Sequence, residues 1–119
     1  KRKLSSFSMG NAAMQFVVIN RAIRPDLTMN SKPHLQALAD HVAYMKGLQE
    51  AGKVVIAGGF ADGSGGMDLI DVETVEEALE ICHNDPLHKA VHVTQEIHPY
   101  FSDLGPRLEG MKKKLATMG

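Results

Sequence analysis

The sequence predicts an α+β fold in which a four-stranded antiparallel sheet carries helices on one face. Three observations predict it. The chain has 119 residues, enough for one hydrophobic core and too few for two. Four short stretches are rich in β-branched residues or alternate apolar with polar residues, and two longer stretches have the apolar spacing of amphipathic helices. Their order, β-α-β-β-α-β, is that of the ferredoxin-like fold.

The first strand and the first helix are predicted from composition and spacing. Met14–Ala22 is short and rich in β-branched residues, which is typical of a strand. After a loop that contains prolines, residues 34–51 predict a helix, with Ser31 as its cap and Pro33 in its first turn. Gly52 stands where a helix-terminating glycine is expected. The stripe expected to face the core consists of Leu35, Leu38, Val42 and Met45, with Leu48 beside it.

A hairpin is predicted in the middle of the chain. Residues 53–60 and 67–72 are the second and third strands, and the glycine-rich residues 61–66 are the turn between them. A phosphate-binding loop is the alternative interpretation of these glycines. The segment lacks the GK[ST] of a P-loop and precedes a strand rather than a helix, so we expect a turn.

The second helix has a start signal and a stop signal. Thr74 and Glu77 have the spacing of a capping box. The Asn-Asp-Pro sequence at 84–86 ends the helix, and one short helical turn is expected at 87–90. Cys82 falls within this helix, so we expect a buried structural thiol rather than a nucleophile.

In residues 91–98, apolar and polar side chains alternate, which predicts the fourth strand. One face is expected to carry Val91, Val93 and Ile97, and the other His92, Thr94, Glu96 and His98. The tail is expected to be helical after Pro106. We therefore predict a folded domain at 14–99, a partly helical C-terminal tail at 100–119, and an arm at 1–13 that is disordered or a remnant of the expression vector.

Charge and composition exclude several classes of protein. Residues 1–24 carry five basic side chains and no acid, whereas residues 26–109 carry five basic and fourteen acidic side chains. An acidic body repels phosphate backbones, so we expect no nucleic-acid partner. No apolar run is long enough to span a membrane. The single cysteine fits a reducing compartment and predicts a cytoplasmic protein, although the basic N-terminus leaves an organellar location open.

A homodimer is predicted from the first two strands. In the first strand, Phe16 and Val18 face one way while the equally apolar Val17 and Ile19 face the other, and residues 54–57 of the second strand are likewise apolar on both faces. Because the helices cover only one face of the sheet, the second apolar face needs a cover. A second copy of the chain, packed sheet on sheet, would supply it, and a higher homo-oligomer is the alternative.

Six histidines raise the question of metal ligands and acid/base groups. No two histidines stand four residues apart within one predicted helix, so we predict no dedicated metal site. His92 shares its predicted strand face with polar neighbours, and this row lines either a cleft or a solvated rim. His41 lies at the edge of the buried helix face, where it is either a half-buried structural histidine or a group that faces a cleft.

Three features resemble the YciI-like (YCII-related) family, whose members belong to the dimeric α+β barrel superfamily. His41 precedes the Ala51-Gly52 helix end by eleven residues. The strand sequence GKVVIAG at 52–58 matches the family's G-x-[LV]-x-x-[AS]-G pattern. Asp85-Pro86 follows the second helix as in the family's Asp-Pro motif. The chain departs from the family at Gly59-Phe60, where proline is usual after the strand glycine, and at Leu87, where an aromatic residue is usual.

The resemblance implies a homodimeric barrel with a catalytic pair formed by His41 and Asp85. It implies a cofactor-independent enzyme of lyase, isomerase or dehydrohalogenase type, in which this pair transfers protons on a small organic substrate. Gly58, Phe60 and His92 are the candidate substrate-binding residues. The alternatives are a non-catalytic domain that binds a small ligand or a protein partner, and a monooxygenase-like reaction as found in the wider superfamily.

Overall fold

The structure is a computed structural model that describes residues 14–119; the predicted arm at 1–13 lies outside the described residues. The elements, in chain order, are β1 (Met14–Ala22), α1 (Lys32–Glu50), β2 (Val54–Gly59), β3 (Gly65–Val72), α2 (Val75–His83), α3 (Pro86–Lys89), β4 (Val93–Tyr100) and α4 (Arg107–Met118).

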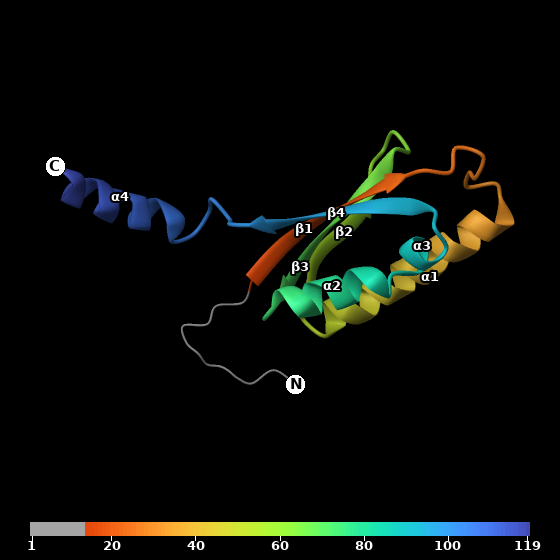
Figure 1. The fold of residues 1–119 in the computed structure, drawn as a ribbon, viewed down its shortest axis with the longest axis horizontal. Helices are drawn as coiled ribbons and strands as arrows, with labels where there is room; N and C mark the ends of the chain where they lie inside the picture. The colour runs from red at the N-terminus through yellow and green to blue at the C-terminus, as the bar shows by residue number, and fades with distance from the viewer. Residues whose placement is uncertain (1–13) are drawn as a thin grey trace.

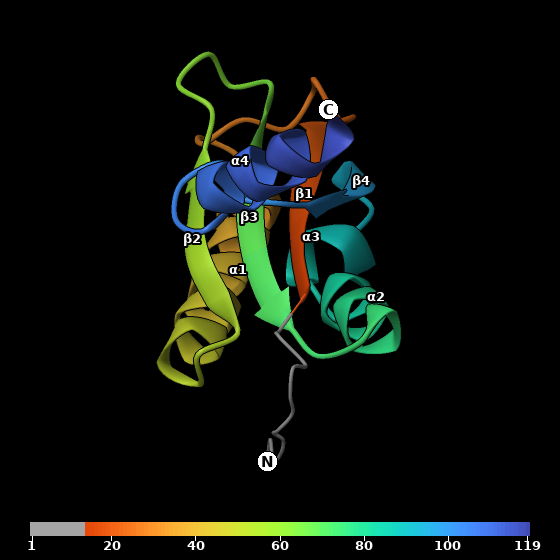
Figure 2. The same cartoon turned by 90° about the vertical axis from the view of Figure 1, so that its left-hand side faces the viewer.

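The four strands form one antiparallel sheet in the order β2-β3-β1-β4. Helices α1, α2 and α3 cover one face of this sheet, as Figure 1 shows from the side and Figure 2 after a quarter turn. Within the described residues, no helix packs on the opposite face. The predicted α+β fold of the ferredoxin-like type and the predicted C-terminal helix are confirmed.

The hydrophobic core lies between the sheet and the helices. Phe16 and Val18 of β1 and Ile70 and Val72 of β3 project toward the helices and are almost fully buried. They pack with Met45 of α1 in one cluster. Because side chains of a strand alternate between faces, these four residues also fix which residues of β1 and β3 face away from the helices.

The face of α1 that is buried differs from the predicted stripe. Ala37, His41 and Met45 are its buried residues. By contrast, Leu35 is 46% exposed and Val42 is 58% exposed. Val42 lines a cavity described below instead of joining the core, so apolar spacing alone selected a partly wrong face.

The helix starts are only partly as expected. Thr74 Oγ1 accepts a hydrogen bond from the Glu77 backbone N–H at 3.1 Å, as the capping box predicts. The Glu77 carboxylate, however, accepts from the backbone N–H of Glu73 rather than from that of Thr74. Ser31 precedes α1 as predicted, but its hydroxyl donates to the carbonyl of Thr28 and does not cap the helix.

The fourth strand begins later than predicted and extends further. β4 starts at Val93, because Val91 has a φ of +60° and its N–H bonds back to His88 O in α3. His92 is therefore buried at the end of the α3 turn and not on a strand face. Proline does not end β4, since this is an edge strand and an edge position tolerates the missing donor. The exposed residues of the predicted polar row are Thr94, Glu96 and His98.

Helix α4 projects from the end of β4, away from the rest of the molecule (Figure 1). None of its residues is buried, and its apolar side chains fall on one stripe: Leu108, Met111, Leu115 and Met118. Among residues 14–119, no helix is long and apolar enough to cross a membrane.

Candidate active site

His41 and Asp85 come from different elements and meet between α1 and α3. His41 lies on the buried face of α1, and Asp85 precedes α3. Their side chains approach until Nδ1 of the ring and Oδ1 of the carboxylate are 2.8 Å apart. Asp85 is 1% exposed and His41 is 9% exposed, so little water competes with this contact.

The position of Asp85 is fixed by the turn in which it stands. Its Oδ1 also accepts the Leu87 N–H at 2.9 Å and thereby caps the N-terminus of α3. Pro86 stands in the first turn of α3, and because proline has no backbone N–H it needs no hydrogen-bond acceptor there. The helix-stop sequence thus has two roles, because the oxygen that caps α3 is also the oxygen that bonds the imidazole.

The geometry defines the tautomer of His41. An ionised carboxylate only accepts hydrogen bonds, so the proton lies on Nδ1 and the neutral ring has its lone pair on Nε2. Burial lowers the pKa of His41, but the hydrogen bond to Asp85 and the negative charges of Asp85 and Asp68 outweigh burial and raise this pKa above its usual value. The imidazole is thereby made more basic.

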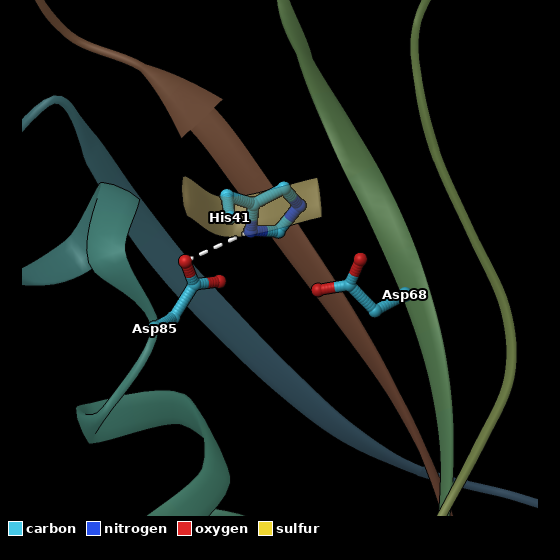
Figure 3. Close-up of side chains that lie close together, drawn as sticks. All are labelled: His41, Asp68 and Asp85. Carbon is cyan, nitrogen blue, oxygen red and sulfur yellow. Dashed lines mark hydrogen bonds and ion pairs between the residues drawn. The ribbon is translucent and has the colours of Figure 1, made fainter. Parts of the chain in front are cut away.

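A second carboxylate, which the sequence analysis missed, lies beside the ring. Asp68 of β3 is 3% exposed and lies on the other side of His41 from Asp85 (Figure 3). Its Oδ2 accepts a hydrogen bond from Asn20 Nδ2 at 3.1 Å. One nitrogen of His41 and one carboxylate oxygen each of Asp68 and Asp85 all lie within 4.8 Å of one another, a spacing at which the charges of the three groups interact strongly and at which they could hold a cation.

One signal in the sequence could have found Asp68. It stands two residues before Ile70 and four before Val72, so strand alternation places it on the same face as these core residues. A charged residue on a core-facing position is rarely accidental, because an unpaired buried charge is costly. Asn20 satisfies the same criterion in β1, after Phe16 and Val18.

His41 lines a cavity of about 820 Å³ between α1, the loop after β1 and the β2–β3 hairpin. Two of the three candidate substrate-binding residues, Gly58 and Phe60, also line it. His92 does not line it, but contacts the lining residue His34, with the two Nδ1 atoms 3.2 Å apart. Asn20 also lines the cavity, and the sequence analysis did not select it.

The arrangement is suited to proton transfer. A base at the wall of a largely apolar cavity, oriented by a buried carboxylate, can take a proton from a bound molecule and return it elsewhere. Cys82 is no rival as a nucleophile, because burial and the nearby carboxylates raise its pKa to about 12. This agrees with the buried thiol that the sequence predicts.

Comparison with known proteins gives three similarities. The model of the YCII-related domain family matches residues 14–98. The uncharacterised protein YjpA of Bacillus subtilis is 37% identical over 62 residues, which are 51% of this chain and 73% of that protein.

Among solved structures, 5-chloro-2-hydroxyhydroquinone dehydrochlorinase (TftG) of Burkholderia phenoliruptrix, in complex with 2,5-dihydroxybenzoquinone, is similar with a TM-score of 0.60. The alignment is 20% identical and covers 74% of this chain and 94% of that one, so this similarity concerns the fold. The family match covers β1, β2, β3, the three helices packed on the sheet and β4 as far as residue 98, and it confirms the resemblance that the sequence motifs indicated. This chain therefore belongs to the YCII-related domain family.

Proposed function

We propose that the protein is a cofactor-independent enzyme of lyase, isomerase or dehydrohalogenase type that uses His41 and Asp85 for acid/base chemistry on a small organic molecule. The observation that carries the proposal is the 2.8 Å contact between His41 Nδ1 and Asp85 Oδ1 at the wall of the cavity. In this scheme His41 is the base, and Asp85 holds its tautomer and stabilises the imidazolium ion that forms.

The chemistry needs only a proton acceptor at a sheltered position. When His41 Nε2 removes a proton from carbon, the electrons of the C–H bond can expel a leaving group on the neighbouring carbon, which is elimination. If the proton returns to a different carbon, the result is isomerisation. The dehydrochlorinase with the same fold carries out an elimination by name, which supports elimination as a reaction that this fold can host.

A binding domain is the second candidate. The cavity is lined mainly by apolar side chains and glycines, and Asp85 already has a structural role as the cap of α3. Both facts are compatible with a protein that holds a small ligand without changing it. A homodimer packed sheet on sheet is compatible with both candidate functions.

The two candidates are separated by observing the carbon-bound protons of a ligand. A panel of chlorinated and unchlorinated hydroxyquinones is incubated with the protein in D₂O and followed by proton NMR and chloride release. We expect deuterium exchange or chloride release with the unmodified protein, and a loss of roughly 100-fold or more in His41→Gln and Asp85→Asn. His83→Gln, which changes an exposed histidine at the end of α2, is the matched control and should retain activity. A compound that binds in the cavity without exchange or release would favour the binding domain.

A further inference from the structure

We propose that Asp68 is a third member of the acid/base group and that its carboxyl group gains and loses its proton as one electrostatically coupled set with the His41–Asp85 pair. The consequence for catalysis rests on the proposed function, whereas the coupling of the three groups does not. Asp68 is a positioning residue in this proposal, because it acts through His41 and does not line the cavity.

The first observation is the burial of Asp68 among apolar neighbours. It is 3% exposed and stands on the helix-facing side of β3, in the same row as Ile70 and Val72. No Lys or Arg side chain is paired with it by an ion pair in residues 14–119. An ionised carboxylate in such surroundings needs compensation by hydrogen bonds or by a nearby positive charge.

The second observation is incomplete hydrogen bonding. Oδ2 of Asp68 accepts from Asn20 Nδ2, but Oδ1 is buried and has no hydrogen-bond partner. Oδ1 of Asn20 is buried and unpartnered as well. Asn20 and Asp68 together therefore have more hydrogen-bond acceptors than donors. A proton on the Asp68 carboxyl group supplies the missing donor.

The third observation is the proximity of the other two groups. Asp68 points toward the imidazole ring of His41, on the side opposite Asp85 (Figure 3). With both carboxylates ionised and the ring neutral, the cluster would carry two negative charges in a buried space. The first proton, on the ring, reduces this to one, and a second proton, on Asp68, makes the cluster neutral. Groups this close titrate as a coupled set.

The surroundings of Asp68 favour this assignment. His41 faces it from α1, Asp85 from the turn before α3, Cys82 from α2 and Asn20 from β1. Cys82 stays neutral at physiological pH, so His41 and Asp85 are the charged groups nearby. Burial raises the pKa of Asp68 to about 6, against the opposing effects of His41 and Asn20, and the pKa of His41 is raised as well.

The consequence for catalysis is a change in the pH range in which His41 can act. Ionised Asp68 stabilises the imidazolium form, so its removal should release the proton of His41 at lower pH. In the proposed enzyme, the acidic limb of the pH–rate profile of Asp68→Asn would therefore move to lower pH.

The test is an NMR titration of the histidine ring nitrogens and carbons without substrate, so its result does not depend on whether the protein is an enzyme. In the unmodified protein we expect His41 to titrate in two steps. In Asp68→Asn we expect one step, at a pH lower by on the order of one unit. Asp40→Asn, which removes an exposed carboxylate next to His41 in α1, is the matched control and should leave the two steps in place.

A second measurement needs no variant at Asp68. The side-chain carboxyl carbon of Asp68 should titrate near pH 6 in the unmodified protein, and this midpoint should move in His41→Gln. The proposal is overturned if Asp68 titrates at the ordinary value for an aspartate, or if the His41 curve is the same with and without Asp68. It is also overturned if the purified protein holds a stoichiometric metal ion that Asp68→Asn loses, since a cation would then occupy the place of the proton.

Discussion

A buried carboxyl group that keeps its proton up to about pH 6 makes the stability of this domain depend on pH. The pKa of Asp68 is higher in the folded protein than the ordinary 3.8 that applies after unfolding. The folded state thus binds this proton more tightly. Its contribution to the free energy of unfolding is complete below pH 3.8 and is lost as the pH rises through about 6.

We therefore expect the unmodified protein to lose stability relative to Asp68→Asn between pH 4 and pH 7.5. The shift corresponds to roughly 3 kcal/mol of unfolding free energy, since one pKa unit is worth about 1.4 kcal/mol. Urea denaturation of both proteins at the two pH values measures the difference. Parallel pH dependences of the two proteins would show that Asp68 titrates normally.

Single residues were predictable where they follow a local pattern, and the candidate pair shows the limit. The spacing of α1 placed His41 at the edge of a buried face, and the Asp-Pro turn identified Asp85 as a helix-stop residue. Only the family resemblance joined the two, because 44 positions separate them in the chain. Strand alternation could have marked Asp68 and Asn20 as polar residues on core-facing positions, but their hydrogen bond to each other depends on the register of β1 and β3, which no local pattern gives.

At the level of the elements, the β2–β3 hairpin depends on one glycine in particular. Gly65 has a φ of +146°, and a Cβ atom there would lie 1.8 Å from the backbone oxygen of Asn20. The strand pairing of β1 with β3 leaves no room for the oxygen to move, since Arg21 pairs with Gly65 in this register. Any side chain at this position would have to displace β1. This strand positions Asn20 in the wall of the cavity.

We expect Gly65→Ala to destabilise the domain by more than about 2 kcal/mol, because it combines backbone strain with a backbone clash. Gly47→Ala is the matched control. Gly47 lies within α1 with nothing within 4 Å of an added Cβ, so its substitution should stabilise the protein by about 0.5 to 1 kcal/mol. Thermal unfolding of both variants, monitored by circular dichroism, tests the pair. Equal effects of the two substitutions would contradict the assignment of Gly65 as sterically constrained.

The elements themselves were largely predictable, and the errors have physical causes. β1 matches its predicted bounds, because β-branched residues in a short run leave little ambiguity. The start of β4 was wrong because Val91 adopts a positive φ, which is uncommon for a β-branched residue and has no sequence signal. The buried face of α1 was partly wrong because Val42 lines the cavity rather than the core, and apolar spacing does not distinguish these two environments.

For the whole molecule, the sheet face without helices is the largest feature that needs an explanation. The register places one apolar row across three strands on that face: Val17 and Ile19 of β1, Met67 and Leu69 of β3, and Ile56 of β2. These side chains are half-buried or exposed in the single chain. The helices of the same chain already cover the other face of the sheet. We therefore expect the sheet of a second copy to cover this one.

We expect the protein to be a dimer of its 12.9 kDa chain in solution, with the two sheets packed face to face. Leu69 lies in the middle of the apolar row, opposite Val17 on one side and Ile56 on the other. Leu69→Asp would bury a carboxylate at the centre of the interface, so the mass measured by light scattering after gel filtration should fall by half. Leu79→Asp changes an exposed leucine on α2, on the helix side of the sheet, and should leave the dimer intact. Circular dichroism checks that both variants are folded. A monomeric unmodified protein would mean that the apolar row is exposed to solvent. A dimer that persists in Leu69→Asp would mean that a different surface joins the two copies.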